Sequence, residues 1–217
     1  IGILYRKYGL IDYTEYNPKQ NNELKGIMAP VTKESKDFFL TRKITEKTII
    51  KNYFDIYSTK DNKISFIYRK IFDVNLVKIR TTEEKCEHYI TKKIKDLCLW
   101  KLDYCDYDLP LVICEGELDQ LSFEEQGFYN AVSVPSGAGS LGWIDTEFSE
   151  LEKFKEIVLC FDMDKAGQDA VKKIIPRLPE NCIVKVIDFG TLEKENGKMV
   201  KDANDIHMLG LNLMDYV

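Results

Sequence analysis

Hydrophobic runs alternate with amphipathic stretches along the second half of the chain. Short runs typical of buried strands lie at residues 111–114, 131–134, 157–161 and 182–188. Helical spacing of hydrophobic residues lies at about residues 117–127, 147–153 and 165–175. Strands that alternate with helices predict a mostly parallel sheet with right-handed crossovers. We therefore expect an α/β, Rossmann-like fold here, with an irregular insertion at about residues 190–200.

The first half opens without a regular pattern and then becomes helical. Residues 1–30 show no clear spacing of hydrophobic positions, and we interpret them as an irregular arm or linker. Two helical patterns follow within residues 31–51. Thr32 is suited to cap the first helix, and either Thr41 or Thr45 the second, because a Thr side chain can accept a hydrogen bond from the first turn.

Alternation of hydrophobic and polar residues then predicts strands. It occurs at residues 53–57, 64–69 and 73–80, and residues 59–62 between the first two carry a turn signal. The three strands predict a small antiparallel meander. With the preceding helices, it forms an α+β subdomain in front of the α/β part.

Length and charge divide the chain in two. Its 217 residues suffice for one large domain or two small ones, and a linker-like stretch at residues 103–110 separates a domain of residues 1–105 from one of residues 106–217. The overall charge of −5 conceals a net charge of +7 in the first part and −12 in the second. This asymmetry indicates phosphate binding by the first and metal binding by the second; a solvated surface with segregated charges is the alternative.

Other features of the composition concern the compartment and the extent of the chain. The chain begins at Ile, so we expect a fragment or a processed product. No hydrophobic run reaches the roughly 18 residues that span a bilayer, so we expect a soluble protein with no membrane partner. The six Cys form no C-x-x-C pair, which argues against a zinc site or a disulfide framework. Cys114 and Cys160 fall inside predicted strands, and reduced thiols suit the cytoplasm or an organelle matrix.

Acidic residues follow the predicted strands. Glu115 ends the first strand and Asp119 follows it by about one helical turn, while Asp162 and Asp164 come directly after the third strand and Asp202 after the fourth. Ligands of parallel sheets bind at the carboxyl ends of the strands. Carboxylates gathered there repel one another unless cations neutralise them, and oxygen ligands alone suit Mg²⁺ or Mn²⁺. The pattern predicts a metal-dependent phosphoryl-transfer site.

Three segments that carry these acids resemble a known family. Glu115-Gly-Glu-Leu-Asp119, Asp162-Met-Asp164-Lys-Ala-Gly167 and Lys201-Asp-Ala-Asn204 are similar to the acidic signatures of the Toprim domain. More narrowly, they resemble the primase half of the Twinkle-like primase–helicases of phages and organelles, to which DnaG-type primases are related. The resemblance implies a Toprim domain preceded by a small α+β primase subdomain.

The resemblance also implies an activity and roles for the acidic residues. The expected reaction is RNA primer synthesis on single-stranded DNA, in which a 3′-hydroxyl attacks the α-phosphate of an NTP and two cations about 3.5–4 Å apart stabilise the reacting oxygens. Glu115 is implied as a metal ligand or general base, with Asp119 positioning it. Metal ligation is implied for Asp162, Asp164 and Asp202. Glu117 is a candidate for the second metal or its hydration shell, and Asp205 is a weaker candidate.

Basic residues and a glycine-rich loop are the expected nucleotide contacts. The resemblance places Lys78 opposite the metals, where it touches nucleotide phosphate, and Arg80, Lys85 and Lys201 are further candidates. For Lys78, Arg80 and Lys85, an exposed edge charge is the alternative. The backbone of the loop with Ser136, Gly137 and Gly139 is suited to cradle a triphosphate. Arg42 stands at the Arg of the family's Arg-Gly-Ile-Ser helix entry, although Lys43 replaces the Gly. We interpret Trp100 as a core residue rather than a stacking surface.

Two alternatives remain open, and two family parts have no signature here. Toprim nucleases and topoisomerases use similar acids to cut DNA, and some primase-like domains serve only to bind single-stranded DNA. The zinc ribbon of the family needs paired Cys, and its helicase needs a G-x-x-x-x-G-K-[ST] loop, neither of which occurs in this sequence. We expect both domains elsewhere on the full-length chain.

Overall fold

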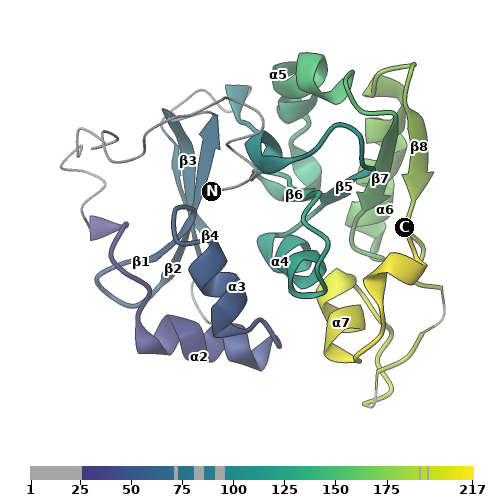
Figure 1. Ribbon diagram of the computed structural model, residues 1–217. Helices are drawn as coiled ribbons and strands as arrows, with labels where there is room; N and C mark the ends of the chain where they lie inside the picture. The colour runs from purple at the N-terminus through teal and green to yellow at the C-terminus, as the bar shows by residue number, and fades with distance from the viewer. Residues whose placement is uncertain (1–25, 71–72, 81–85, 91–95, 191, 195) are drawn as a thin grey trace.

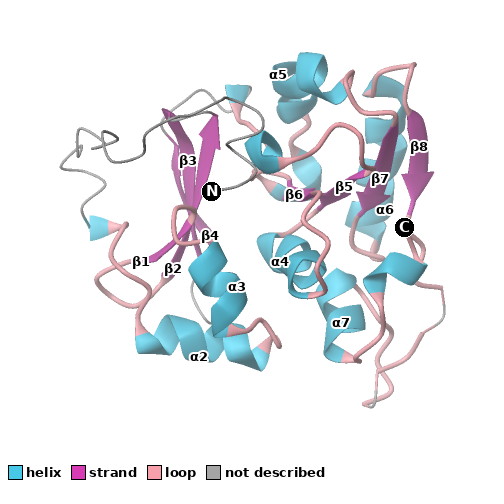
Figure 2. Ribbon diagram, in the orientation of Figure 1, coloured by secondary structure: helices cyan, strands magenta, loops and turns pink. Residues whose placement is uncertain are grey.

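The computed structural model contains two four-stranded sheets, one antiparallel and one parallel. It describes residues 26–70, 73–80, 86–90, 96–190, 192–194 and 196–217. Figures 1 and 2 show the antiparallel sheet on the left with two helices below it, and the parallel sheet on the right between further helices. Helix α4 (Glu117–Glu125) lies between the two parts.

The antiparallel sheet has the order β1-β2-β3-β4. Its strands are β1 (Ile56–Ser58), β2 (Ile64–Lys70), β3 (Asp73–Arg80) and β4 (Cys86–Ile90). Asn62, in the turn between the first two, has a positive φ of 63°, a conformation that Asn tolerates better than most residues. The predicted meander is therefore confirmed, but it has a fourth strand that the sequence pattern did not indicate.

Two helices precede this sheet, α2 (Lys33–Thr41) and α3 (Glu46–Lys51). The Thr32 side chain accepts a hydrogen bond from the Ser35 backbone N–H and caps α2, as predicted. Thr45 stands at the cap position of α3, but its hydroxyl donates to Glu125 in α4 instead of serving the helix. The cap position of α3 is therefore used to join the helix to the other part of the molecule.

The parallel sheet has the order β6-β5-β7-β8 and matches the predicted Rossmann-like arrangement. Its strands are β5 (Leu111–Cys114), β6 (Ala131–Ser133), β7 (Glu156–Cys160) and β8 (Ile183–Val186). Beside α4, its helices are α5 (Gly142–Leu151), α6 (Lys165–Ile174) and α7 (Ala203–Met208). Short 3₁₀ turns lie at Leu102–Tyr104, Gly137–Gly139, Ile175–Arg177 and Leu213–Asp215.

Helix α5 begins five residues before its predicted start. Trp143 and Ile144 in its first turn are fully buried in the core of the parallel-sheet part. Packing of these two large side chains against the sheet stabilises a turn that the local sequence alone did not favour.

Buried hydrophobic side chains join the two parts. One cluster combines Phe39, Phe66 and Trp100 with Leu118 and Leu121 of α4. Trp100 has no exposed surface, so its interpretation as a core residue is confirmed. Its backbone also forms a bridge to Ser133 of β6. The antiparallel sheet is thus held at a fixed position beside the parallel one.

A buried polar network crosses the same contact. The Lys101 ammonium pairs with Glu124 of α4, and the Asn52 amide donates to the other oxygen of that carboxylate. Gln120 also donates to Glu124. Because each polar group in a buried position needs a partner, the network favours one relative placement of the two parts.

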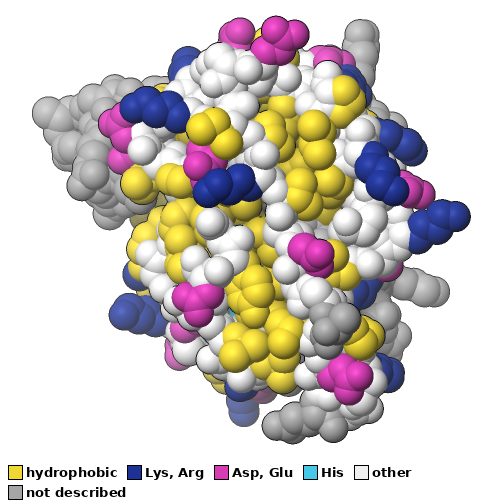
Figure 3. Space-filling model, turned by 90° about the vertical axis from the view of Figure 1, so that its right-hand side faces the viewer, with side chains coloured by type: hydrophobic (Ala, Val, Ile, Leu, Met, Phe, Trp, Pro, Cys, Tyr) yellow, Lys and Arg dark blue, Asp and Glu magenta, His cyan; other side chains and the backbone are white. Residues whose placement is uncertain are grey.

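Strand β8 forms the outer edge of the parallel sheet. Ile183 and Val186 in this strand are exposed, and Figure 3 looks onto this side of the molecule, where hydrophobic side chains lie among scattered charges. None of the helices in the described residues is long and hydrophobic enough to cross a bilayer.

Candidate active site

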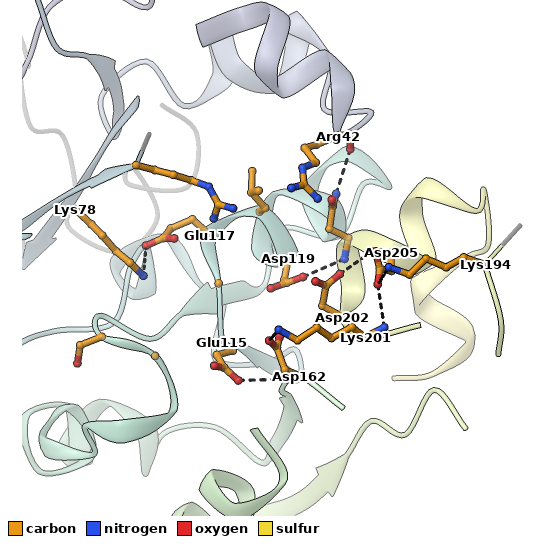
Figure 4. Close-up of a pocket in the computed structure, with 16 residues that line it drawn as sticks. Arg42, Lys78, Glu115, Glu117, Asp119, Asp162, Lys194, Lys201, Asp202 and Asp205 are labelled. Carbon is orange, nitrogen blue, oxygen red and sulfur yellow. Dashed lines mark hydrogen bonds and ion pairs between the residues drawn. The ribbon is translucent and has the colours of Figure 1, made fainter. Parts of the chain in front are cut away.

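An open pocket of about 570 Å³ lies where the antiparallel sheet faces the edge of the parallel sheet at which its strands end. Its lining comes from α4, from the ends of β3, β5 and β7, and from the segment leading into α7. Figure 4 shows acidic side chains on one side of the pocket and Lys78 on the other. The lining residues are Arg42, Lys78, Arg80, Glu115, Gly116, Glu117, Leu118, Asp119, Ser136, Gly137, Asp162, Lys194, Lys201, Asp202, Asn204 and Asp205.

Glu115 directly follows β5 and bridges to the neighbouring strand end. Its backbone N–H donates to the Cys160 carbonyl, and its carboxylate accepts from the Asp162 N–H at 3.3 Å. Cys114 and Cys160, which are paired in register beneath these acids, are buried as predicted. The parallel register of β5 and β7 therefore brings Glu115 next to Asp162.

Close packing of α6 fixes the loop after β7. Asp164 is the N-cap of α6, with its Oδ1 atom accepting from the Gly167 N–H at 3.0 Å. A Cβ atom at Gly167 would lie 2.3 Å from the Asp162 carbonyl oxygen. Only a residue without a side chain fits at this point, and the contact holds the Asp162 backbone in place.

The segment before α7 brings the third group of acids. The Met163 N–H donates to the Lys201 carbonyl at 2.7 Å, which joins this segment to the loop after β7. Asp202 caps α7 by accepting from the Asp205 N–H at 2.8 Å. The Asn204 N–H in turn donates to Asp119 Oδ1 at 3.0 Å. Asp119 of α4 and Asp202 are thereby held on the same side of the pocket.

Lys201 contacts two of the acids at once. Its Nζ atom lies 2.8 Å from Asp162 Oδ2 and 3.3 Å from Asp164 Oδ2. A second lysine, Lys194, pairs with Asp205. The acidic side of the pocket therefore carries its own positive charges (Figure 4).

The basic side is built around a buried ion pair. Lys78 of β3 is 7% exposed, and its Nζ atom lies 2.8 Å from Glu117 Oε1. The Tyr68 hydroxyl also donates to Glu117 and lies 3.0 Å from the Val134 carbonyl. Glu117 therefore pairs with Lys78 and accepts a hydrogen bond from Tyr68.

Two arginines continue the basic side. The guanidinium carbons of Arg42 and Arg80 lie 5.9 and 5.8 Å from the ring centre of Phe38, distances typical of cation–π contacts. Neither arginine pairs with a carboxylate among the residues that the structure describes. Arg80 Nε is buried without a hydrogen-bond partner in the same set, and so is Ser136 Oγ. The pocket therefore offers cationic groups and unpaired donors to an anionic ligand.

Burial and mutual repulsion raise the pKa of several acids here. Burial first, and then the charge of Asp162, raises the pKa of Glu115. For Asp119 the pKa rises well above the usual range through burial and the charges of Asp202 and Asp162. The pKa of Asp162 and that of Asp202 are also raised, mainly by burial. Deprotonation of this set becomes easier when positive charge is brought to it.

Two acids have the opposite shift. The Gly167 N–H, as the largest cause, lowers the pKa of Asp164, and Lys201 contributes. Burial alone would raise the pKa of Glu117, but Lys78 and the Tyr68 hydroxyl hold it below its usual value. These two carboxylates stay ionised within their existing contacts.

The donor chemistry of the acidic side fits a hard divalent cation. Glu115, Asp119, Asp162 and Asp202 offer oxygen only, and burial and neighbouring negative charges raise the pKa of all four, so a bound cation would stabilise their ionised forms. Within the described ranges, no three His, Cys, Asp or Glu side chains form a ready cluster for one ion. Each of these carboxylates instead accepts from a protein donor through one of its oxygens.

The structure brings most of the predicted site residues together. Those that line the pocket are Lys78, Arg80, Glu115, Asp119, Ser136, Gly137, Asp162, Lys201 and Asp202. Asp164 and Gly139 are not in the lining, although Asp164 reaches Lys201 from its edge. Lys85 lies outside the described residues. The catalytic and binding roles of all these residues remain predictions.

Three further residues of the site were not assigned roles by the sequence. Tyr68 looks like one more hydrophobic position of a strand, and only its contact with Glu117 shows its use. Asn204 is 2% exposed and joins Asp119 to α7; its place inside the third acidic segment was the available signal. Lys194 lies in an insertion without regular pattern and had none.

Comparison with known proteins agrees with this geometry. Residues 112–207 match the Toprim-like family. The chain is 32% identical over 200 residues to the "Primase homolog protein" of Arabidopsis thaliana, covering 83% of this chain and 57% of the relative. It is 30% identical over 198 residues to the Arabidopsis "Twinkle homolog protein, chloroplastic/mitochondrial", covering 83% of this chain and 27% of the relative.

A solved structure shares the fold of both parts. The crystal structure of the primase fragment of the bacteriophage T7 primase-helicase protein superposes with a TM-score of 0.68 at 26% identity, over 82% of this chain and 72% of that one. The resemblance to Toprim-containing primase cores inferred from the acidic segments is confirmed. Residues 112–207 are thus similar to Toprim-like domains, and the chain shares the fold of a primase fragment.

Proposed function

We propose that this chain is the catalytic core of a DNA primase, which joins NTPs into short RNA primers on a single-stranded DNA template. The observation that carries the proposal is the pocket itself. Four carboxylates from three segments of the chain face a buried lysine and two arginines across a space of about 570 Å³. This arrangement suits a ligand with a metal on one side and negatively charged phosphates on the other.

Different residues of the pocket would serve the metal ions and the phosphates. Glu115, Asp119, Asp162 and Asp202 would hold the divalent cations, which when bound supply positive charge to the attacking and leaving oxygens. Glu115, with its raised pKa, is suited to accept the proton of the attacking 3′-hydroxyl. Lys78 would bind phosphate from the opposite side, and Arg42 and Arg80 extend that charge. Pyrophosphate leaves when the new phosphodiester bond forms.

The relatives support this reading and suggest a larger protein. One is named a primase homologue and another a Twinkle homologue, and the similar fold is the primase fragment of a primase-helicase. The chain spans 57% and 27% of the two curated relatives, so a zinc ribbon and a helicase on the full-length protein are part of the proposal. The expected partners are single-stranded DNA, NTPs and the growing primer.

The compartment follows from the same reading. Primer synthesis occurs where DNA is replicated, so we propose the cytoplasm of a bacterium or infected host, or an organelle matrix. The name of the Arabidopsis Twinkle homologue places that protein in chloroplasts and mitochondria. Reduced thiols, such as the buried Cys114 and Cys160, suit either compartment.

Extension of a supplied RNA primer on a DNA template tests the activity without requiring template recognition by a zinc ribbon. With NTPs and Mg²⁺ or Mn²⁺, we expect template-directed extension, and Asp162→Asn should reduce its rate by at least about 100-fold, since it removes charge from the metal side. As a control, the variant should unfold at about the same temperature as the parent, which would show that it is folded. Nicking of the template would instead support a nuclease, and DNA binding without extension would support a binding module.

A further inference from the structure

The side chain of Lys201 stands where positive charge is needed by the acids. Its Nζ atom lies 2.8 Å from Asp162 and 3.3 Å from Asp164, between the two carboxylates that follow β7 (Figure 4). No other lysine or arginine among the described residues pairs with either of them. The loop after β7 therefore obtains its charge balance from a distant segment of the chain.

The Lys201 backbone is fixed, whereas its side chain is not. The backbone N–H donates to Asp205 Oδ2 at 2.9 Å, and the carbonyl accepts from the Met163 N–H at 2.7 Å. The side chain is half exposed, and within the described part of the chain its ammonium is held only by the two carboxylates. Its four-carbon stem can therefore move the charge into solvent or toward a ligand without any change in the backbone.

A lysine in this position and a divalent cation compete for the same oxygens. Asp162 Oδ2 cannot hold an ammonium at 2.8 Å and also ligate a dication without close repulsion between the two positive charges. The contrast with Lys78 is informative, because Lys78 is buried and pairs with Glu117, which lies on the other side of the pocket from Asp162. Among the residues that the structure describes, Lys201 is the one cation that would compete with a metal for Asp162.

We propose that Lys201 is an intramolecular counter-ion that neutralises Asp162 and Asp164 until a divalent cation replaces it. The inference rests on the proposed function in taking Asp162 as a metal ligand. Once displaced, the ammonium remains tethered beside the site and is free to meet the phosphates that arrive with the metal. The lysine thus stabilises the unliganded pocket and sets a threshold for metal binding.

The proposal predicts two effects of opposite sign for Lys201→Gln in the full chain. Without divalent cations the variant should unfold at a lower temperature, by about 2–4 °C, because two neighbouring carboxylates lose their counter-ion. Its affinity for Mn²⁺, measured by calorimetry or electron paramagnetic resonance without nucleotide, should rise about fivefold to tenfold after allowance for the exposure of the lysine.

Lys194→Gln is the matched control. It removes one positive charge from the same pocket, but its partner is Asp205 and not Asp162 or Asp164. We expect its Mn²⁺ affinity to stay within about twofold of the parent, since its ammonium contacts neither Asp162 nor Asp164 and salt screens a charge beyond direct contact.

The outcomes separate the counter-ion from other roles. Unchanged or weaker Mn²⁺ binding in Lys201→Gln would overturn the proposal and favour a lysine that serves only the nucleotide. Equal gains in both variants would overturn it in favour of a general field effect. Absence of Mn²⁺ binding in all three proteins would also overturn it, because Lys201 would then have no cation to compete with. Neither the unfolding temperature nor the Mn²⁺ affinity requires primer synthesis. Both can therefore be interpreted even if the primase assay fails.

Discussion

The two sides of the pocket are constructed differently. On the basic side, Lys78 is buried and fixed by Glu117, which Tyr68 holds in turn. On the acidic side, the carboxylates accept from backbone N–H groups and from a half-exposed lysine. The basic side is therefore preorganised for a phosphate, whereas the acidic side can exchange its internal donors for cations.

The difference also explains the opposite pKa shifts. Glu117 is fully buried but has its pKa lowered, because a cation and a hydroxyl already satisfy it. Burial and neighbouring negative charges raise the pKa of Asp119 well above its usual range. Glu117 belongs to an ion pair that already balances its charge, whereas the negative charges around Asp119 are not balanced in this way.

Removal of Glu117 should have the largest effect on stability. Glu117→Ala leaves Lys78 buried without its partner, so we expect a loss of about 3–5 kcal/mol in the free energy of unfolding, measured with denaturant. The pair of changes Glu117→Leu and Lys78→Met should restore most of this loss while abolishing nucleotide binding. A loss below about 1 kcal/mol in Glu117→Ala would mean that Lys78 is not fixed in this way.

Gly167→Ala should damage the acidic side with a smaller effect on the whole fold. The new Cβ would meet the Asp162 backbone, with its carbonyl oxygen only 2.3 Å away, so the loop after β7 must shift. We expect primer extension to fall by about 100-fold, since misplacement of about 1 Å is enough for such a loss. Gly26→Ala is the control, because nothing lies within 4 Å of a Cβ there and Gly26 does not line the pocket. Equal activity of the two variants would contradict the positioning role of this contact.

Lowering the pH should affect the acidic side more than the basic side. Glu115, Asp119, Asp162 and Asp202 have raised pKa values, so protons compete with metal at a higher pH than for ordinary carboxylates. We expect Mn²⁺ affinity to fall about tenfold or more between pH 7 and pH 5, with proton release on binding measured by calorimetry in two buffers. An Mn²⁺ affinity that stays constant between pH 7 and pH 5 would contradict the raised pKa values of these acids.

The same shifts determine how the stability of the protein without divalent cations depends on pH. Because the folded-state pKa values of these four acids are raised, the folded chain binds more protons than the unfolded chain between the ordinary and the raised values. Their contribution to the free energy of unfolding therefore decreases as the pH rises through that window. Asp119→Asn should flatten this dependence, which thermal unfolding at several pH values would measure.

Tyr68→Phe should give the smallest effect. It removes one donor to Glu117 but leaves the Lys78 contact, so we expect a loss of about 1 kcal/mol in the free energy of unfolding. The Michaelis constant for NTPs should rise only about twofold to threefold, because Lys78 keeps its partner. A loss as large as that of Glu117→Ala would show that the tyrosine, and not the lysine, is the main partner of Glu117.

Much of the fold could be predicted because its signals are local. Hydrophobic runs such as Leu111–Cys114 and Glu156–Cys160 mark buried parallel strands, and the acids that follow them must meet at one edge. Strand Cys86–Ile90 was missed, since its hydrophobic and polar residues alternate only weakly and its pairing with β3 depends on tertiary packing. The early start of α5 depends on burial of Trp143, which no local pattern reports.

The individual contacts of the site could not be predicted in the same way. That Lys78 pairs with Glu117, or that Lys201 reaches Asp162, depends on segments about 40 residues apart and on the facing of two sheets. Sequence reasoning treated Glu117 as a candidate for the second metal. The structure places it within the basic side, in a contact that only the packing of α4 against β3 creates.

Location of the metal tests the central claim most directly. A crystal soaked with Mn²⁺ and an NTP analogue should show an anomalous difference peak in the pocket, within ligand distance of Asp162 and at least one of Glu115, Asp119 and Asp202, with the phosphates extending toward Lys78. The Lys201 ammonium should have left Asp162 in that complex. A peak elsewhere, or a nucleotide bound with no ion at these carboxylates, would contradict the account.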